Sequence, residues 1–116
     1  MKLEEGMYIR TKNGCICQIL RTTYSKYLSR NKELCYEIDR PINANMELYD
    51  EDIFKVSHNI IDLIQVGDYV NGWKVLYRTD GTKVVDDGYA TNLDKISVKS
   101  IVTKEQMESM SYKVGE

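Results

Sequence analysis

A short motif that occurs twice constrains the fold most strongly. Gly6-Met7-Tyr8-Ile9 and Gly67-Asp68-Tyr69-Val70 share the pattern Gly-x-Tyr-[Ile/Val], and each leads into Asn-Gly, at 13–14 and at 71–72. Asn-Gly between β-prone runs predicts a hairpin, because both central residues of a type I′ turn need a positive φ. The recurrence predicts two β-rich halves that each open on such a strand.

The neighbouring segments indicate a diverged duplication with halves near residues 1–62 and 63–116. Residues 59–64 are expected to close the first half as a short strand or 3₁₀ turn, since the apolar segment is too short for a stable helix. Asp80-Gly81 predicts a further hairpin. The expected strands lie at 7–12, 15–20, 33–39, 53–57, 73–78, 82–85 and 95–98, and Pro41 is expected to end the third of them.

The C-terminal segment differs, because Thr103 and Gln106 have the spacing of a capping box and predict a short helix at 104–110. The fold class expected is therefore mainly β: two tandem SH3-like small barrels, or one composite antiparallel β-barrel, with a short C-terminal helix. Each half is near the lower size limit for folding alone, so we expect a shared interface or homo-oligomers.

Composition narrows the classes of function. The formal net charge is −2, so the whole chain has no field that attracts nucleic acid, and any such binding needs a local patch. No apolar run reaches the roughly 20 residues that span a bilayer, and the N-terminus has no signal-peptide pattern. We expect a cytoplasmic protein with three reduced cysteines.

Catalytic and metal chemistry find little support in the residues. His58 is the single histidine, and Cys15, Cys17 and Cys35 lack the ligand spacing of structural zinc sites. The acidic runs at 50–52 and 86–87 are expected to be solvated loops. The sequence predicts a non-enzyme without cofactor or metal, and a nuclease that uses Asp86 and Asp87 is the alternative.

A basic and aromatic segment at residues 21–32 is the candidate binding site. No acidic residue interrupts it, and such a loop can hold phosphates or stack a base, or meet an acidic protein surface. A charged hairpin tip that only keeps the protein soluble is the alternative. In contrast, Trp73 and Tyr77 share a strand face with Val75 and are expected in the core. The predicted partner-binding residues are Arg21, Tyr24, Lys26, Tyr27, Arg30 and Lys32.

Two further segments resemble a family of small proteins encoded by phages and prophages of Gram-positive bacteria. They are Asn-Ile-Ile-Asp-Leu-Ile-x-Val-Gly-Asp-Tyr-Val-Asn-Gly at 59–72 and Ile-Val-Thr-Lys-Glu-Gln at 101–106. The resemblance implies a phage protein that inhibits a bacterial defence system by binding a host effector protein, in the manner of an anti-CRISPR. The alternatives are a sponge that sequesters a nucleotide immune signal through Arg21, Tyr24 and Tyr27, and a nucleic-acid-binding or virion-assembly adaptor.

Overall fold

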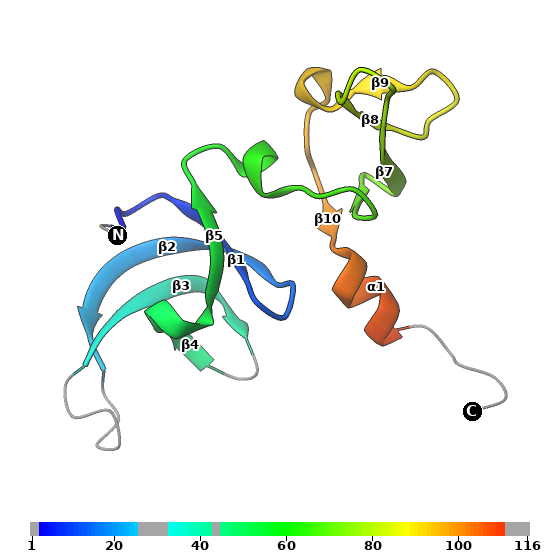
Figure 1. Ribbon diagram of the computed structural model, residues 1–116. Coiled ribbons are helices and arrows are strands. Elements are labelled where there is room, and N and C mark those ends of the chain that lie inside the picture. The colour runs from blue at the N-terminus through cyan, green and yellow to red at the C-terminus, as the bar shows by residue number, and fades with distance from the viewer. Residues whose placement is uncertain (1–2, 26–32, 43–44, 111–116) are drawn as a thin grey trace, which may run out of the picture. The chain divides into compact units, whose positions relative to one another are not determined.

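The protein is mainly β, with two antiparallel five-stranded sheets and one short C-terminal helix (Figure 1). The computed structural model describes residues 3–25, 33–42 and 45–110, and side chains within these ranges except at 41–46. The chain divides into two compact units, Met1–Leu63 and Ile64–Glu116. This boundary lies one residue after the one inferred from the repeated motif.

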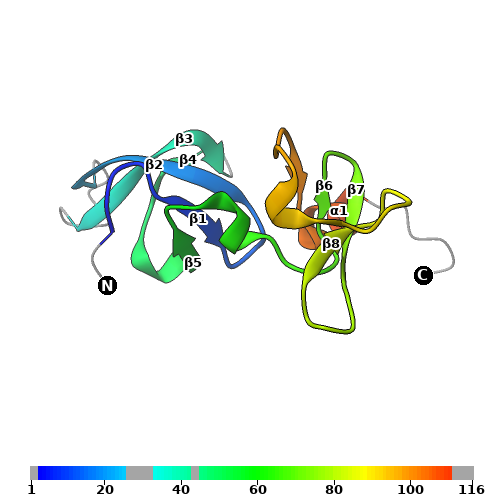
Figure 2. The same ribbon diagram turned by 90° about the horizontal axis from the view of Figure 1, so that it is seen from above.

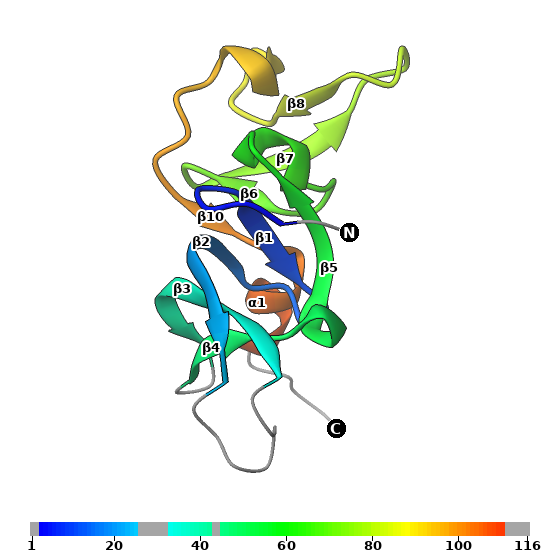
Figure 3. The ribbon, with the colours of Figure 1, turned by 90° about the vertical axis from the view of Figure 1, so that its left-hand side faces the viewer.

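The first unit has the strand order β4-β3-β2-β1-β5, so its last strand pairs with its first (Figure 3). A 3₁₀ helix at Asp50–Asp52 precedes the fifth strand, and another at Ile60–Leu63 follows it, which confirms one of the two forms predicted for residues 59–64. The strands are β1 (Tyr8–Thr11), β2 (Ile16–Tyr24), β3 (Leu34–Ile42), β4 (Asn45–Leu48) and β5 (Ile53–Ser57).

The second unit repeats this arrangement with shorter strands. Its order is β10-β6-β7-β8-β9, so here too the fifth strand pairs with the first. A 3₁₀ helix at Leu93–Lys95 precedes the fifth strand, and helix α1 (Lys104–Met110) follows it. The shared series of elements supports a duplication. The strands are β6 (Tyr69–Val70), β7 (Trp73–Tyr77), β8 (Lys83–Val85), β9 (Thr91–Asn92) and β10 (Ile101–Val102).

The repeated glycines occupy equivalent turns at the start of each sheet. Gly6 and Gly67 have φ of 86° and 97°, a backbone region that residues with a Cβ atom rarely adopt. The amide of Met7 donates to the Glu4 carbonyl at 3.2 Å. In the second unit the amide of Asp68 donates to Gln65 at 3.0 Å, which is the same bond in the same turn.

The two Asn-Gly turns differ. Asn71 and Gly72 both have positive φ, so the predicted type I′ turn is confirmed there. At the first Asn-Gly only Gly14 has a positive φ, and its amide donates to the Thr11 carbonyl at 3.0 Å. That hairpin is a type I turn followed by a glycine bulge, and the type I′ prediction is wrong, because one more residue, Lys12, belongs to the loop.

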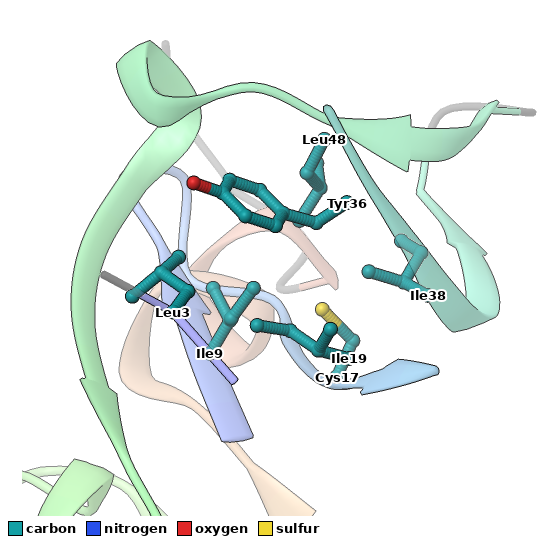
Figure 4. Close-up of a cluster of buried hydrophobic side chains, with 7 residues drawn as sticks. All are labelled: Leu3, Ile9, Cys17, Ile19, Tyr36, Ile38 and Leu48. Atoms are coloured by element: carbon teal, nitrogen blue, oxygen red, sulfur yellow. The ribbon is translucent and has the colours of Figure 1, made fainter. Parts of the chain in front are cut away.

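The core of the first unit is a cluster of aliphatic side chains with one tyrosine (Figure 4). Ile9 and Ile38 are fully buried, and burial of each such side chain contributes about 1.5–3 kcal/mol. The Tyr36 ring lies over the cluster and its hydroxyl donates to Asp50 at 2.7 Å. The buried members are Leu3, Ile9, Cys17, Ile19, Tyr36, Ile38 and Leu48.

The core of the second unit is smaller. Val70, Val75 and Val85 are buried on one face of its sheet. Trp73 and Tyr77 share the face of Val75 but are 49% and 62% exposed, so the expectation that they are core residues is wrong. They stand at the two ends of β7, where the short neighbouring strands leave them uncovered.

Three further sequence expectations need correction. Residues 95–98 form no strand, since the chain leaves a 3₁₀ helix there and pairs with β6 only at β10. Strands β4 and β9 were not predicted, because four and two residues carry too little alternation. Pro41 lies inside β3 rather than ending it, in the stretch where the register with β4 shifts.

Candidate binding surface

The predicted binding segment, residues 21–32, begins within β2 and ends shortly before β3. These two strands pair as an antiparallel hairpin (Figure 2). Of the six predicted residues, the structure describes Arg21 and Tyr24, both on β2. Lys26, Tyr27, Arg30 and Lys32 lie outside the described residues. The structural account of the site therefore rests on the paired strands on either side.

Arg21 is engaged in an ion pair. Its Nε lies 2.6 Å from Oε2 of Glu37, the residue directly opposite on β3. The two side chains are 59% and 26% exposed, so the pair contributes about 0.2–1 kcal/mol. A phosphate that bound Arg21 would compete with this carboxylate.

Tyr24 projects from the other face of the hairpin. From Arg21 onward the pairing of β2 with β3 is regular, and residues three positions apart on a strand point to opposite faces. Tyr24 lies on the face of Tyr36, whereas Arg21 and Glu37 lie on the reverse face. Arg21 and Tyr24 therefore lie on opposite faces of the hairpin, where one small ligand would not contact both side chains.

Tyr24 and Leu34 instead form an exposed apolar pair, here called the Tyr24–Leu34 surface. They are direct cross-strand partners, 66% and 48% exposed. On the same face the buried Tyr36 continues into the core, so the surface extends the core face outward along the hairpin. Sequence reasoning missed Leu34, although an apolar residue just after the basic segment was a usable signal.

Four buried polar side chains lie on the reverse face of the same hairpin, here called the hairpin network. The Ser25 Oγ lies 2.7 Å from the Tyr49 hydroxyl, and Oε2 of Glu47 lies 3.4 Å and 3.3 Å from these two oxygens. Burial, then the charge of Glu47 and a hydrogen bond to it, raise the pKa of the Cys35 thiol. A neutral, buried thiol is a poor nucleophile.

The other residues weighed for chemistry are dispersed. Cys17 faces Ile9 on β1, whereas Cys35 faces Thr23 much further along β2. His58 is exposed and its Nε2 lies 3.2 Å from a Glu4 carboxylate oxygen. Within the residues that the structure describes, no three His, Cys, Asp or Glu side chains gather as metal ligands would.

In both acidic runs a carboxylate accepts hydrogen bonds that stabilise a turn. Asp87 accepts hydrogen bonds from the Tyr89 amide at 2.9 Å and the Thr91 hydroxyl at 2.7 Å, and the Thr91 bond is the main cause of its lowered pKa. Asp52 accepts the Tyr49 amide at 3.0 Å, closing the 3₁₀ turn before β5. These contacts give the carboxylates structural partners.

Comparison of the chain with models of protein families, with curated proteins and with solved structures finds no match. Among the helices in the described part of the chain, none has the length and apolar character needed to cross a membrane.

Proposed function

We propose that this chain is a non-catalytic binding protein whose partner docks on the Tyr24–Leu34 surface. The observation that carries the proposal is the exposure of two large apolar side chains directly opposite each other on one hairpin. An isolated exposed apolar residue needs no explanation, but an exposed pair that continues a core face is typical of an interaction site.

The chemistry of the pair suits protein recognition. Tyrosine combines a large apolar ring with a polar tip and loses little side-chain entropy on docking. Such residues are frequent among those that carry most of an interface's binding energy. The basic residues Lys26, Arg30 and Lys32 follow Tyr24 in sequence and lie outside the described residues.

Among partners, we favour a protein, in line with the resemblance to phage-encoded proteins that implies a host defence effector. The net charge of −2 gives no general attraction for nucleic acid. A nucleotide sponge remains the second candidate because Tyr24 offers a ring for stacking. The opposite facing of Arg21 weakens it.

The scaffold proposed for each unit is an SH3-like small barrel. Two features support this assignment in both units: a sheet whose fifth strand pairs with the first, and a 3₁₀ helix between the fourth strand and the fifth. Among the described residues, hydrogen-bonded pairing leaves β4 and β5 as the edges of the first sheet, and β9 and β10 as the edges of the second.

A pull-down from bacterial host lysate tests the proposal, with the protein immobilised as wild type and as the double variant Tyr24→Ala, Leu34→Ala. Tyr77→Ala is the matched control, because Tyr77 is 62% exposed at the end of the second strand of the other unit, opposite Lys83. We expect a stoichiometric host protein on the wild type and on Tyr77→Ala, and its loss from the double variant.

Three outcomes would redirect the proposal. Thermal stabilisation by cyclic or ADP-ribose-type nucleotides, absent in Tyr24→Ala, would establish the sponge instead. Retention of nucleic acid with a steep dependence on salt would establish the adaptor. A host protein retained equally by the double variant would place docking elsewhere on the chain.

A further inference from the structure

The hairpin network connects three strands at one end of the first sheet. Ser25 directly follows β2, Cys35 is the second residue of β3, and Glu47 belongs to β4, which Tyr49 follows. Their side chains are 8%, 0%, 9% and 7% exposed, respectively. Buried polar groups of this kind are costly unless paired, so each holds the others in place.

Two residues of the hairpin network are sequence neighbours of the Tyr24–Leu34 surface. Ser25 and Cys35 are the next residues after Tyr24 and Leu34, and side chains alternate along a strand, so they point to the reverse face. The Ser25 amide also donates to the Glu33 carbonyl at 2.8 Å, which closes the ladder just beyond the exposed pair. The exposed pair is therefore backed, on the reverse face, by buried polar groups.

We propose that the hairpin network, above all the Tyr49 hydroxyl, positions the Tyr24–Leu34 surface for docking. The inference rests on the proposed function, because it assumes that a partner docks on this surface. A surface held in its bound arrangement before contact loses less entropy when it binds. Glu47 also lies opposite Glu37, and two like charges in register destabilise a sheet unless donors compensate them.

A second tyrosine–carboxylate contact in the same unit supplies a matched control. The Tyr36 hydroxyl donates to Asp50 at 2.7 Å, and Tyr36 is 4% exposed. Tyr36→Phe removes a buried hydroxyl with the same chemistry as Tyr49→Phe. It leaves the hairpin network intact.

The test uses the isolated full chain, as wild type, Tyr49→Phe and Tyr36→Phe, with amide hydrogen exchange followed residue by residue. We expect Tyr49→Phe to speed exchange of the Ser25 amide about ten-fold relative to wild type, since a lost hydrogen bond of about 1.4 kcal/mol has that effect. Exchange in β1, reported by the Ile9 amide, should stay within two-fold. Tyr36→Phe should leave Ser25 unchanged.

A second readout is the nuclear Overhauser effect between the Tyr24 ring and the Leu34 methyl groups. We expect it to weaken in Tyr49→Phe and to persist in Tyr36→Phe. If Tyr49→Phe does not fold, Ser25→Ala breaks the network from the other strand and takes its place. Equal acceleration of exchange across the whole sheet, or an unchanged Ser25 amide, would overturn the positioning role. Neither readout needs a partner, so failure of the pull-down alone would refute only the docking function.

Discussion

The buried carboxylate of Asp68 accepts a hydrogen bond from the Lys104 amide at 2.9 Å, across 36 positions of sequence. Its other oxygen accepts the Gln65 amide at 2.7 Å, so one side chain joins the turn before β6 to the first turn of α1. Met7 holds the equivalent position in the first unit and has no carboxylate to offer. The two units share this turn, but in the second unit its side chain also binds the helix that follows the sheet.

Asp68→Ala should destabilise the second unit by about 2–5 kcal/mol, because two backbone donors lose a charged acceptor. Asp68→Asn keeps one acceptor oxygen and should cost less. Urea unfolding followed by the fluorescence of Trp73, the single tryptophan and a residue of the second unit, measures both. Unchanged midpoints for both variants would contradict the role assigned to Asp68.

Asn71→Ala should cost about 2–4 kcal/mol. The Asn71 side chain accepts the amides of Lys99 and Ser100 at 2.8 and 3.1 Å and donates to the Ser97 carbonyl at 3.0 Å. Its φ of 52° adds strain for alanine. Asn13→Ala is the control, because Asn13 lacks the positive φ and its side-chain oxygen accepts a hydrogen bond from the Thr11 hydroxyl within the same turn. Equal losses of stability for the two variants would contradict this account.

The stability of the first unit should fall as pH rises from about 9 to 12. Burial, then the Asp39 charge, raises the pKa of Cys17 to about 12, and burial with the Asp50 hydrogen bond raises that of Tyr36 to about 12. Below pH 9 both groups are protonated in the folded and unfolded chain. Above their ordinary values, 9.0 and 10.0, the unfolded chain loses these protons first, so unfolding becomes easier.

By pH 12 the Tyr36 share of this loss is about 2 kcal/mol, at 1.36 kcal/mol per pKa unit. Far-UV circular dichroism of urea unfolding at pH 8, 10 and 12 gives the slope, and Tyr36→Phe and Cys17→Ala should each flatten it. A wild-type stability independent of pH over this range would be inconsistent with the two raised pKa values.

Local patterns predicted the parts of the fold that depend on local chemistry. The capping box is confirmed, since Thr103 and Gln106 exchange hydrogen bonds at 3.0 and 3.2 Å at the start of α1. The turn at Asn71 follows from two residues that tolerate positive φ. In contrast, β9 forms only because β8 is beside it, and no run of two residues carries that information.

The candidate site shows the same division. A tyrosine beside cations drew attention to the β2–β3 hairpin. The face on which each side chain lies depends on strand register, and a bulge between Ile19 and Arg21 shifts that register. The hairpin network could not be predicted, because Ser25 meets Tyr49 only when three strands align. Arg21 looked like a cation available to a ligand because its partner Glu37 lies 16 residues away.

The most direct test of the central claim is the affinity for the protein partner that the pull-down recovers from host lysate. Titration measures it for the wild type, Tyr24→Ala and Tyr77→Ala. Removal of an anchor at the centre of an interface costs at least about 2 kcal/mol, which is roughly a 30-fold weaker Kd. We predict that loss for Tyr24→Ala and a Kd within two-fold of wild type for Tyr77→Ala. Equal affinities for Tyr24→Ala and wild type would contradict docking at the Tyr24–Leu34 surface.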